Sequence, residues 1–353
     1  MKNRMFFSAK TKNFFVDFND HMILVARTSG ATAPLVVEEI LECPPGDPAA
    51  LQEALKTLQV KKSPSGYLQA SCGIYAPKRV VRRVPLEAKR LKEPAYLNEV
   101  AVQQLRIEPD QFTLTLLNPA DGTAFDLTKA GPKDALFCGL PTQDINTTQE
   151  KLLANGIYPE RLELGSVASV GALVDYLAFA KSKAPVLLLE IDGDTTHSFI
   201  VTAAGVEASR PIAQGLDAMT PVVQKELGLK DEEAARKLFL SNAFDFTGMG
   251  PLLVKKLIKE LQSFIGFYEV QTGQSIGQVC CTLLPSKLGW LETTIGGQLG
   301  VSVLRPDLPA WLQSRQITLA DSIPANAQDA RRFGLFGLMA QYAPHVAVSE
   351  KSQ

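Results

Sequence analysis

Two stretches of the chain decide the fold: residues 14–28 read FFVDFNDHMILVART, and residues 185–203 read PVLLLEIDGDTTHSFIVTA. Each consists of an apolar run, a short polar tip and a second apolar run, which is the pattern of a β-hairpin. The tips are Asn19-Asp20-His21 in the first stretch and Asp192-Gly193-Asp194-Thr195 in the second. Because the same pattern occurs twice, the sequence predicts two similar halves, each opening on a hairpin.

Further strands and helices follow each hairpin. After the first hairpin we expect a strand at 35–41, a helix at 48–58 and a buried strand at 67–74. After the second we expect strands ending at Ile212, at 277–284 and at 301–304, and helices at 216–240, 252–268, 289–299 and 333–342. Strands that alternate with helices indicate an α/β fold.

The chain changes character at about Pro77. Basic residues crowd into the next stretch, and they are Lys78, Arg79, Arg82, Arg83, Lys89, Arg90 and Lys92. Strand-like runs at 111–117 and 134–140 and a helix ending at Gly156 follow, which predicts a subdomain inserted into the first half. The basic cluster predicts a basic surface. It is either a plain solvated face or a contact for acidic lipid headgroups or an acidic segment of a partner.

The overall composition excludes some classes of protein. The chain has 353 residues with 36 Lys and Arg against 37 Asp and Glu, so the formal charge is −1. A nucleic-acid-binding protein usually carries a strongly basic face, which this balance disfavours. No apolar run approaches the roughly 18 residues of a membrane helix, and the basic N-terminus lacks the apolar region of a signal peptide. We therefore expect a cytoplasmic protein.

Cysteine and histidine usage argues against a structural zinc site. The five cysteines are scattered without a Cys-x-x-Cys pair, and the histidines are His21, His197 and His345. Scattered cysteines in apolar runs are typical of reduced thiols in a core, and three separate histidines do not form a zinc motif.

Several segments carry a resemblance to a known family. Residues 15–19 resemble the strand that ends in Asp-Ile-Gly in the actin-like ATPase superfamily, and residues 189–196 resemble its second phosphate-binding hairpin. Residues 162–177 and 333–338 resemble the helices that lead back from an inserted subdomain and close the fold. Within the superfamily, the sequence is similar to the PilM family of type IV pilus assembly, related to FtsA and to the cytoplasmic part of GspL.

The resemblance implies an α/β, actin-like (ribonuclease H-like) two-domain fold with an inserted subdomain in the first half. The implied units are 1–76 (first part of subdomain IA), 77–160 (inserted, IC-like), 161–183 (return to IA), 184–216 and 276–328 (IIA), 217–275 (IIB), 329–344 (C-terminal helix on IA) and 345–353 (tail).

The resemblance also implies a nucleotide cleft between the two hairpins, for ATP and Mg²⁺. Its residues would be Asp17, Asn19, Asp20, Glu190, Asp192, Gly193, Asp194, Thr195 and Thr196. Departures from the family pattern count against nucleotide binding: Asn19 replaces a glycine, and Thr282-Leu283-Leu284-Pro285 replaces the glycine-rich adenosine turn. Since the phosphate and adenosine elements both depart, we expect a pseudo-ATPase, although the acidic cleft with His21 and His197 could still hold a cation.

By resemblance, the function is that of a cytoplasmic adaptor beneath the inner membrane. It would bind the N-terminal cytoplasmic tail of a PilN-like bitopic membrane protein and link the assembly platform to pilus motor ATPases, in a type IV pilus or a type II secretion-like system. The tail would lie in a groove walled by Pro77–Pro85 and Gln111–Leu117. Two alternatives stay open: an active Mg²⁺-ATP-dependent ATPase or kinase of the same superfamily, and an FtsA-like filament former.

Overall fold

The computed structural model describes residues 13–44, 46–59, 66–128, 134–241, 243–324 and 329–341. The predicted tail 345–353, His345 and residues 1–12 of the first unit lie outside the described residues. Both predicted hairpins are present and antiparallel, with Asp17 opposite Leu24 in the first and Glu190 opposite His197 in the second.

The first sheet has six strands in the order β14-β3-β2-β1-β4-β8. The strands are β1 (Asn13–Phe18), β2 (Ile23–Thr28), β3 (Leu35–Cys43), β4 (Leu68–Ile74), β8 (Ile157–Leu164) and β14 (Ile317–Leu319). Strands β1 to β3 are antiparallel, whereas β4 is parallel to both β1 and β8. Helix α1 (Pro48–Leu58), capped by Asp47, packs its leucines against one face of this sheet.

The second sheet repeats this plan with five strands in the order β11-β10-β9-β12-β13. The strands are β9 (Val186–Ile191), β10 (Thr196–Thr202), β11 (Gly205–Ile212), β12 (Gln278–Thr282) and β13 (Ser302–Val303). Again the first three strands are antiparallel, and β12 is parallel to β9 and β13. The repeated hairpin pattern therefore predicts the repeated sheet correctly, and Asp17 and Glu190 occupy equivalent places in the two sheets.

A third sheet lies between β4 and β8 in the chain, in the order β5-β7-β6. Its strands are β5 (Val80–Pro85), β6 (Phe112–Leu117) and β7 (Asp134–Pro141), and it carries α2 (Tyr96–Val100) and is followed by α3 (Thr142–Ala154). The sequence did not predict β5, because Arg82 and Arg83 interrupt its apolar pattern. We call this part of the chain the inserted sheet; the exact subdomain limits stay a prediction.

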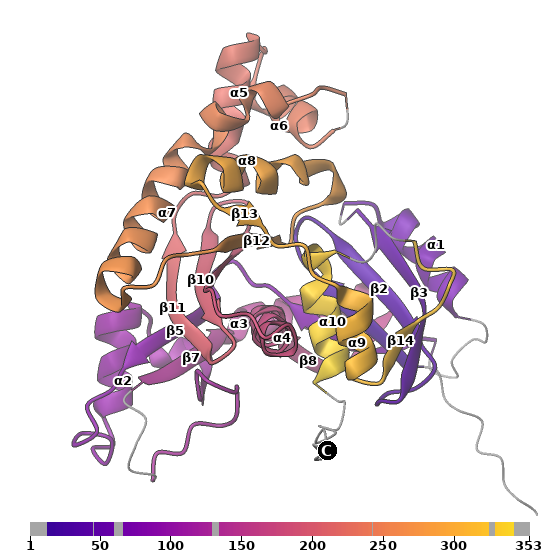
Figure 1. Ribbon diagram of the computed structural model, residues 1–353. Coiled ribbons are helices and arrows are strands. Elements are labelled where there is room, and N and C mark those ends of the chain that lie inside the picture. Colours follow the sequence, from indigo (N-terminus) through magenta and orange to yellow (C-terminus); the bar gives the residue numbers. More distant parts are fainter. Residues whose placement is uncertain are drawn as a thin grey trace, which may run out of the picture.

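Helices cover the second sheet and join the halves (Figure 1). They are α4 (Gly165–Phe179), α5 (Thr220–Leu227), α6 (Glu232–Phe239), α7 (Gly250–Thr272), α8 (Trp290–Leu299), α9 (Leu308–Ser314) and α10 (Phe333–Ala340). Short single-turn helices lie at 101–105 (π), 109–111, 216–219, 247–249, 286–288 and 330–332. The helical stretch predicted at 216–240 is divided, because Gly228 adopts a left-handed φ of 60° and ends α5.

One hydrophobic core crosses from half to half through α4 and α10. It contains Leu24 of the first sheet, Leu173 of α4, Phe336 of α10 and Leu188 of the second sheet. Figure 1 shows α4 and α10 near the middle, between the two main sheets. None of the helices in the described ranges combines the length and apolar character needed to cross a bilayer. The cysteines are all buried and free, in agreement with the sequence.

Candidate functional site

The first hairpin tip is closed by its own asparagine. Asn19 follows β1, and its Oδ1 accepts hydrogen bonds from the backbone N–H groups of His21 and Met22, each at 2.9 Å. The backbone N–H of Asn19 donates to the Met22 carbonyl at 3.2 Å. Backbone N–H groups at such a tip are what an anion would need. Here they are satisfied inside the turn.

The second hairpin tip is held by the segment after β11. The N–H of Asp192 donates to the Thr195 carbonyl at 2.9 Å, and the N–H of Asp217 donates to the Gly193 carbonyl at 2.7 Å. The tip is therefore fixed against its neighbour in the chain, while Asp194 remains exposed.

An arginine joins the two halves at the hairpins. Arg79 lies just before β5, and its side chain is fully buried. Its guanidinium donates to Glu190 Oε2 at 3.0 Å, to Asp192 Oδ2 at 2.6 Å and, through Nε, to Ser166 Oγ at 2.7 Å. The Ser166 hydroxyl at the start of α4 donates to the same Glu190 oxygen. Arg79 therefore brings a positive charge to the place where the two acidic positions of the second hairpin converge.

Burial controls the protonation of the groups around Arg79. Burial raises the pKa of Asp192 to about 6, although Arg79 opposes the rise. His197, whose Nε2 lies 3.8 Å from Asp192 Oδ2, has its pKa held well below the usual value by burial and by the charges of Arg79 and Arg82. His197 is therefore neutral near pH 7, and the strong charge pairing at this point is between Arg79 and the carboxylates.

The other strand-end acid, Asp17, lies in a tight corner next to Tyr75. Asp17 is fully buried, and neither carboxylate oxygen makes a well-formed hydrogen bond within the described residues. Burial raises its pKa to about 7; the nearby Tyr75 hydroxyl lowers it and the Glu190 charge raises it further. A Cβ on Gly334 of α10 would lie 2.2 Å from the Tyr75 oxygen and 2.8 Å from Asp17 Oδ2, so only glycine fits there. The closing helix thus seals this corner.

The turn after β12, predicted as a degenerate adenosine turn, is filled by apolar side chains. Leu283 and Leu284 are 1% and 0% exposed, and Leu283 adopts a left-handed φ of 63°. Glycine adopts this conformation freely, whereas a residue with a side chain incurs about 1–2 kcal/mol. The backbone keeps a glycine-like conformation at Leu283, while the side chains of this turn belong to the core. Thr282 is buried in β12 and Pro285 follows the turn.

The predicted cleft residues come to one end of the two hairpins, but they differ in exposure. Asp17, Asn19, Glu190 and Thr196 are buried; Asp192, Gly193 and Thr195 are half-buried; Asp20 and Asp194 are exposed. Within the residues that the structure describes, no three His, Cys, Asp or Glu side chains come together as a metal site would require. That the cleft acids and the two histidines could hold a cation stays a prediction.

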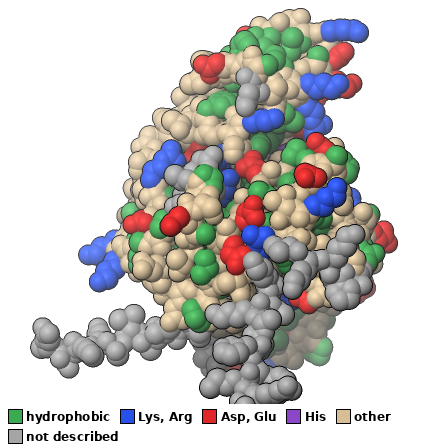
Figure 2. Space-filling model, turned by 90° about the vertical axis from the view of Figure 1, so that its right-hand side faces the viewer, with side chains coloured by type: hydrophobic (Ala, Val, Ile, Leu, Met, Phe, Trp, Pro, Cys, Tyr) green, Lys and Arg blue, Asp and Glu red, His purple; other side chains and the backbone are tan. Residues whose placement is uncertain are grey.

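The residues of the predicted basic surface differ in exposure, and the prediction is wrong for Arg79, which is buried. Arg79 is 3% exposed and serves the interior network, and Arg82 and Arg83 line a groove described below. Arg90 pairs with Glu93 at 2.9 Å and Glu99 at 2.7 Å, whereas Lys78, Lys89 and Lys92 are exposed. Figure 2 shows a different face, the side of α1, β3 and β14 in Figure 1, on which basic and acidic side chains are interspersed. The sequence analysis missed Tyr75, the role of Ser166 and the role of Arg79. The available signal was their position at the carboxyl ends of parallel strands, with Tyr75 and Arg79 after β4 and Ser166 at the start of α4, directly after β8.

A groove of about 540 Å³ lies between the first sheet and the inserted sheet. Phe18 and Asn19 of the first hairpin, Pro77 and Lys78, and Phe112 at the start of β6 line it. Gln111, Pro141 and the α3 residues Thr147, Thr148 and Lys151 complete the opposite wall. Of the two predicted walls, only the beginnings, Pro77-Lys78 and Gln111-Phe112, face this groove.

The doubled sheet with its two hairpins and the inserted sheet define an α/β actin-like fold. No protein-family model matches the chain, and no curated protein sequence does. Among solved structures, the chain is similar to the PilM-PilN type IV pilus biogenesis complex, at a TM-score of 0.65 and 18% identity over 95% of this chain and 99% of that chain. At this identity the likeness establishes the fold, and the predicted resemblance to PilM is confirmed at that level.

Weaker similarities extend to other proteins. The ethanolamine utilization protein EutJ from Carboxydothermus hydrogenoformans has a TM-score of 0.45 at 10% identity over 94% of this chain and 90% of that chain. The cytoplasmic domain of EpsL, an inner-membrane component of the Vibrio cholerae type II secretion system, has a TM-score of 0.39 at 13% identity, over 78% and 84%. Both TM-scores are below 0.5.

Proposed function

We propose that this chain is a non-catalytic adaptor in the assembly platform of a type IV pilus or a type II secretion-like system. It binds the cytoplasmic tail of a PilN-like bitopic membrane protein and is held at the cytoplasmic side of the inner membrane. The observation that carries this proposal is the PilM fold over nearly the whole chain, together with the groove between the first sheet and the inserted sheet. Contact with pilus motor ATPases belongs to the same proposal.

The chemistry of that groove suits an extended peptide. Strand β6 is an edge strand of the inserted sheet, and an edge offers backbone groups to an added strand. Phe18 and Phe112 supply apolar contacts, and the groove carries charges of both signs, from Lys78, Lys151, Asp20 and Asp144. A short tail with apolar side chains and charged residues of both signs matches these features.

We further infer that the cleft between the hairpins does not bind Mg²⁺-ATP, because the residues present do not fit it. Arg79 already pairs with both Glu190 and Asp192, the acids beside which a metal ion would lie. The tip N–H groups are consumed by Asn19, and buried Leu283 belongs to the adenosine turn. A metal ion next to a buried guanidinium would meet like-charge repulsion.

The adaptor proposal is tested with the tail of a bitopic membrane protein encoded next to this chain. A fluorescent peptide of that tail should bind in an anisotropy titration, and Thr148→Trp should weaken binding at least tenfold by filling the groove. Gln149→Trp is the matched control, because Gln149 is exposed on the same helix and does not line the groove. If no such tail binds, or if both variants bind alike, the proposal fails.

The alternative, an active Mg²⁺-ATP-dependent ATPase or kinase, makes an opposite prediction. Ligand that binds the folded state raises the melting temperature. A rise of several degrees with Mg²⁺-ATP that Asp17→Ala abolishes would support the enzyme and contradict the inference about the cleft. The tail titration is independent of this result, so the two parts of the proposal are judged separately.

A further inference from the structure

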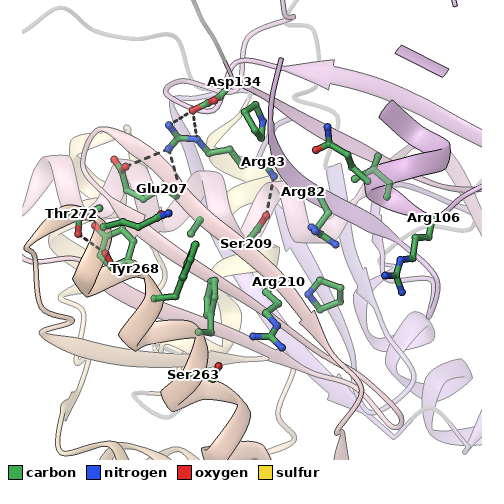
Figure 3. Close-up of a pocket in the computed structure, with 18 residues that line it drawn as sticks. Arg82, Arg83, Arg106, Asp134, Glu207, Ser209, Arg210, Ser263, Tyr268 and Thr272 are labelled. Carbon is green, nitrogen blue, oxygen red and sulfur yellow. Dashed lines mark hydrogen bonds and ion pairs between the residues drawn. The ribbon is translucent and has the colours of Figure 1, made fainter. Parts of the chain in front are cut away.

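A second and larger groove lies on the inserted sheet's other edge. Its volume is about 1350 Å³, and one wall is built by β5 and the turn after the π-helix at 101–105, the other by β11 and α7. Figure 3 shows the arginines around this cavity, with Arg82 and Arg106 on the first wall and Arg210 on β11. We call it the basic groove, defined by Arg82, Arg106 and Arg210 with the aromatic residues Phe264, Phe267 and Tyr268.

The two walls of the basic groove are fixed to each other. Arg83 donates through its backbone N–H to Ser209 Oγ at 2.9 Å and through Nη1 to the Val206 carbonyl at 2.6 Å. Its guanidinium also pairs with Asp134 at 2.5 Å and with Glu207 at 3.3 Å, as the dashed lines in Figure 3 show. Arg83 thereby engages both carboxylates that line the groove. These contacts hold the two walls in place without a ligand, so little conformational entropy of the groove is lost when a ligand binds.

Two of the three other arginines in the groove lack a carboxylate partner in the described ranges. Within the described part of the chain, neither Arg82 nor Arg106 has a carboxylate partner, and the Nε of Arg82 is enclosed without a hydrogen-bond acceptor. Arg210 pairs with Glu260 at 3.1 Å, with both side chains about four-tenths exposed. Burial and the nearby positive charge of Arg210 lower the pKa of Arg82, because both disfavour the charged form of its guanidinium. The partly enclosed charge of Arg82 would be stabilised by an anion, and the exposed Arg106 lies in the same lining with no carboxylate partner of its own among the residues that the structure describes.

The aromatic wall indicates what kind of anion. Phe267 of α7 is 65% exposed, and Phe264 and Tyr268 lie beside it in the lining. An exposed aromatic ring next to unpaired arginines suits a ligand with both acidic and apolar groups. The cavity exceeds the 300–1,000 Å³ range usual for small-molecule pockets, and it is an open groove, so a chain segment fits better than a nucleotide.

We propose that the basic groove docks an acidic, partly apolar segment of a partner protein, with its carboxylates on Arg82, Arg106 and Arg210 and an apolar side chain on Phe267. Arg106 adopts a left-handed φ of 58°, a conformation that is strained for arginine and that directs it to the groove rim. This surface is distinct from the groove proposed for the PilN-like tail, since the linings have no residue in common.

The experiment selects ligands without assuming a partner. A random dodecapeptide display library is panned on the immobilised full chain, and the enriched peptides are synthesised with a fluorescent label for anisotropy titrations. We expect enrichment of Asp and Glu together with apolar residues, and weaker binding as NaCl rises from 0.05 to 0.5 M. The double variant Arg82→Ala/Arg106→Ala should weaken binding at least tenfold.

A matched control removes the same charge from the same region. Lys255→Ala/Lys256→Ala changes two exposed residues of α7 outside the groove and should bind as the parent does. Since Arg82 and Arg106 make no ion pair in the described residues, the arginine variant should keep its melting temperature, which checks folding. Retained binding in Thr148→Trp separates this groove from the other.

Three results would overturn the proposal. The first is enriched peptides with no excess of acidic residues, and the second is equal binding by the arginine variant and the lysine control. The third is arginine-dependent binding of ATP, or of vesicles of phosphatidylglycerol, in place of peptides, which would assign the groove to a nucleotide or to lipid headgroups.

Discussion

Replacing Asp17 by asparagine should stabilise this protein at alkaline pH and have little effect in acid. The pKa of Asp17 is raised from 3.8 to about 7, mainly by burial. Between those values the folded state holds a proton that the unfolded state has released, so the stability contributed by this proton falls as pH rises. Below about pH 4 both states are protonated, and above about pH 7 both are ionised.

The size of the effect follows from the pKa difference. A change from 3.8 to about 7, at about 1.4 kcal/mol per pH unit, corresponds to about 4 kcal/mol of destabilisation at pH 8. Asparagine has the shape of the protonated acid and does not ionise. Asp17→Asn should therefore recover most of the free energy of unfolding that the parent loses at pH 8. With an unfolding entropy of about 2.1 cal/mol/K per residue, this amounts to a melting temperature about 5 °C higher.

The assay is urea denaturation of the parent and Asp17→Asn at pH 4.5 and pH 8, in EDTA and without nucleotide. Asp192, with a pKa near 6, titrates in both proteins and cancels in the difference between them. The reasoning is refuted if Asp17→Asn destabilises the protein at pH 8, which is the result expected if the charged form of Asp17 is needed in the fold. It is also refuted if the substitution has the same effect at both pH values.

Two further substitutions test the network around this corner. Arg79→Ala leaves Glu190 and Asp192 buried without their partner, so it should destabilise by about 3–5 kcal/mol, and more at pH 8 than at pH 5, as measured by urea denaturation; an effect below about 1 kcal/mol would contradict the buried pairing. Gly334→Ala would place a methyl group against the Tyr75 hydroxyl and should lower stability by about 1–3 kcal/mol in thermal melts. Gly171→Ala is the control: its methyl group meets open space in α4, so it should raise stability by up to about 1 kcal/mol through helix propensity alone.

The main elements of the fold were predictable because they depend on local patterns. The hairpins at 14–28 and 185–203 show in the alternation of apolar and polar residues, and the equivalence of their strand ends follows from the repeat. Strand β5 was missed because two arginines replace the apolar alternation that marks a strand. The side chains of these two arginines line a groove instead of packing in the hydrophobic core, so the strand tolerates them.

The role of Arg79 was not predictable from the chain near it. In sequence it belongs to a basic run, which suggests a solvated face. In the fold it meets Glu190 and Asp192, more than one hundred residues away, and is fully buried. Local charge density cannot indicate such a pairing, because it depends on how the two halves meet.

The position of Arg79 bears on how the two halves of the protein are held together. In this chain the guanidinium that joins the first half to the second hairpin is encoded in the polypeptide and cannot dissociate. Under the proposed adaptor function, the contact between the halves would need no nucleotide, and any timing would come from partners that bind and leave.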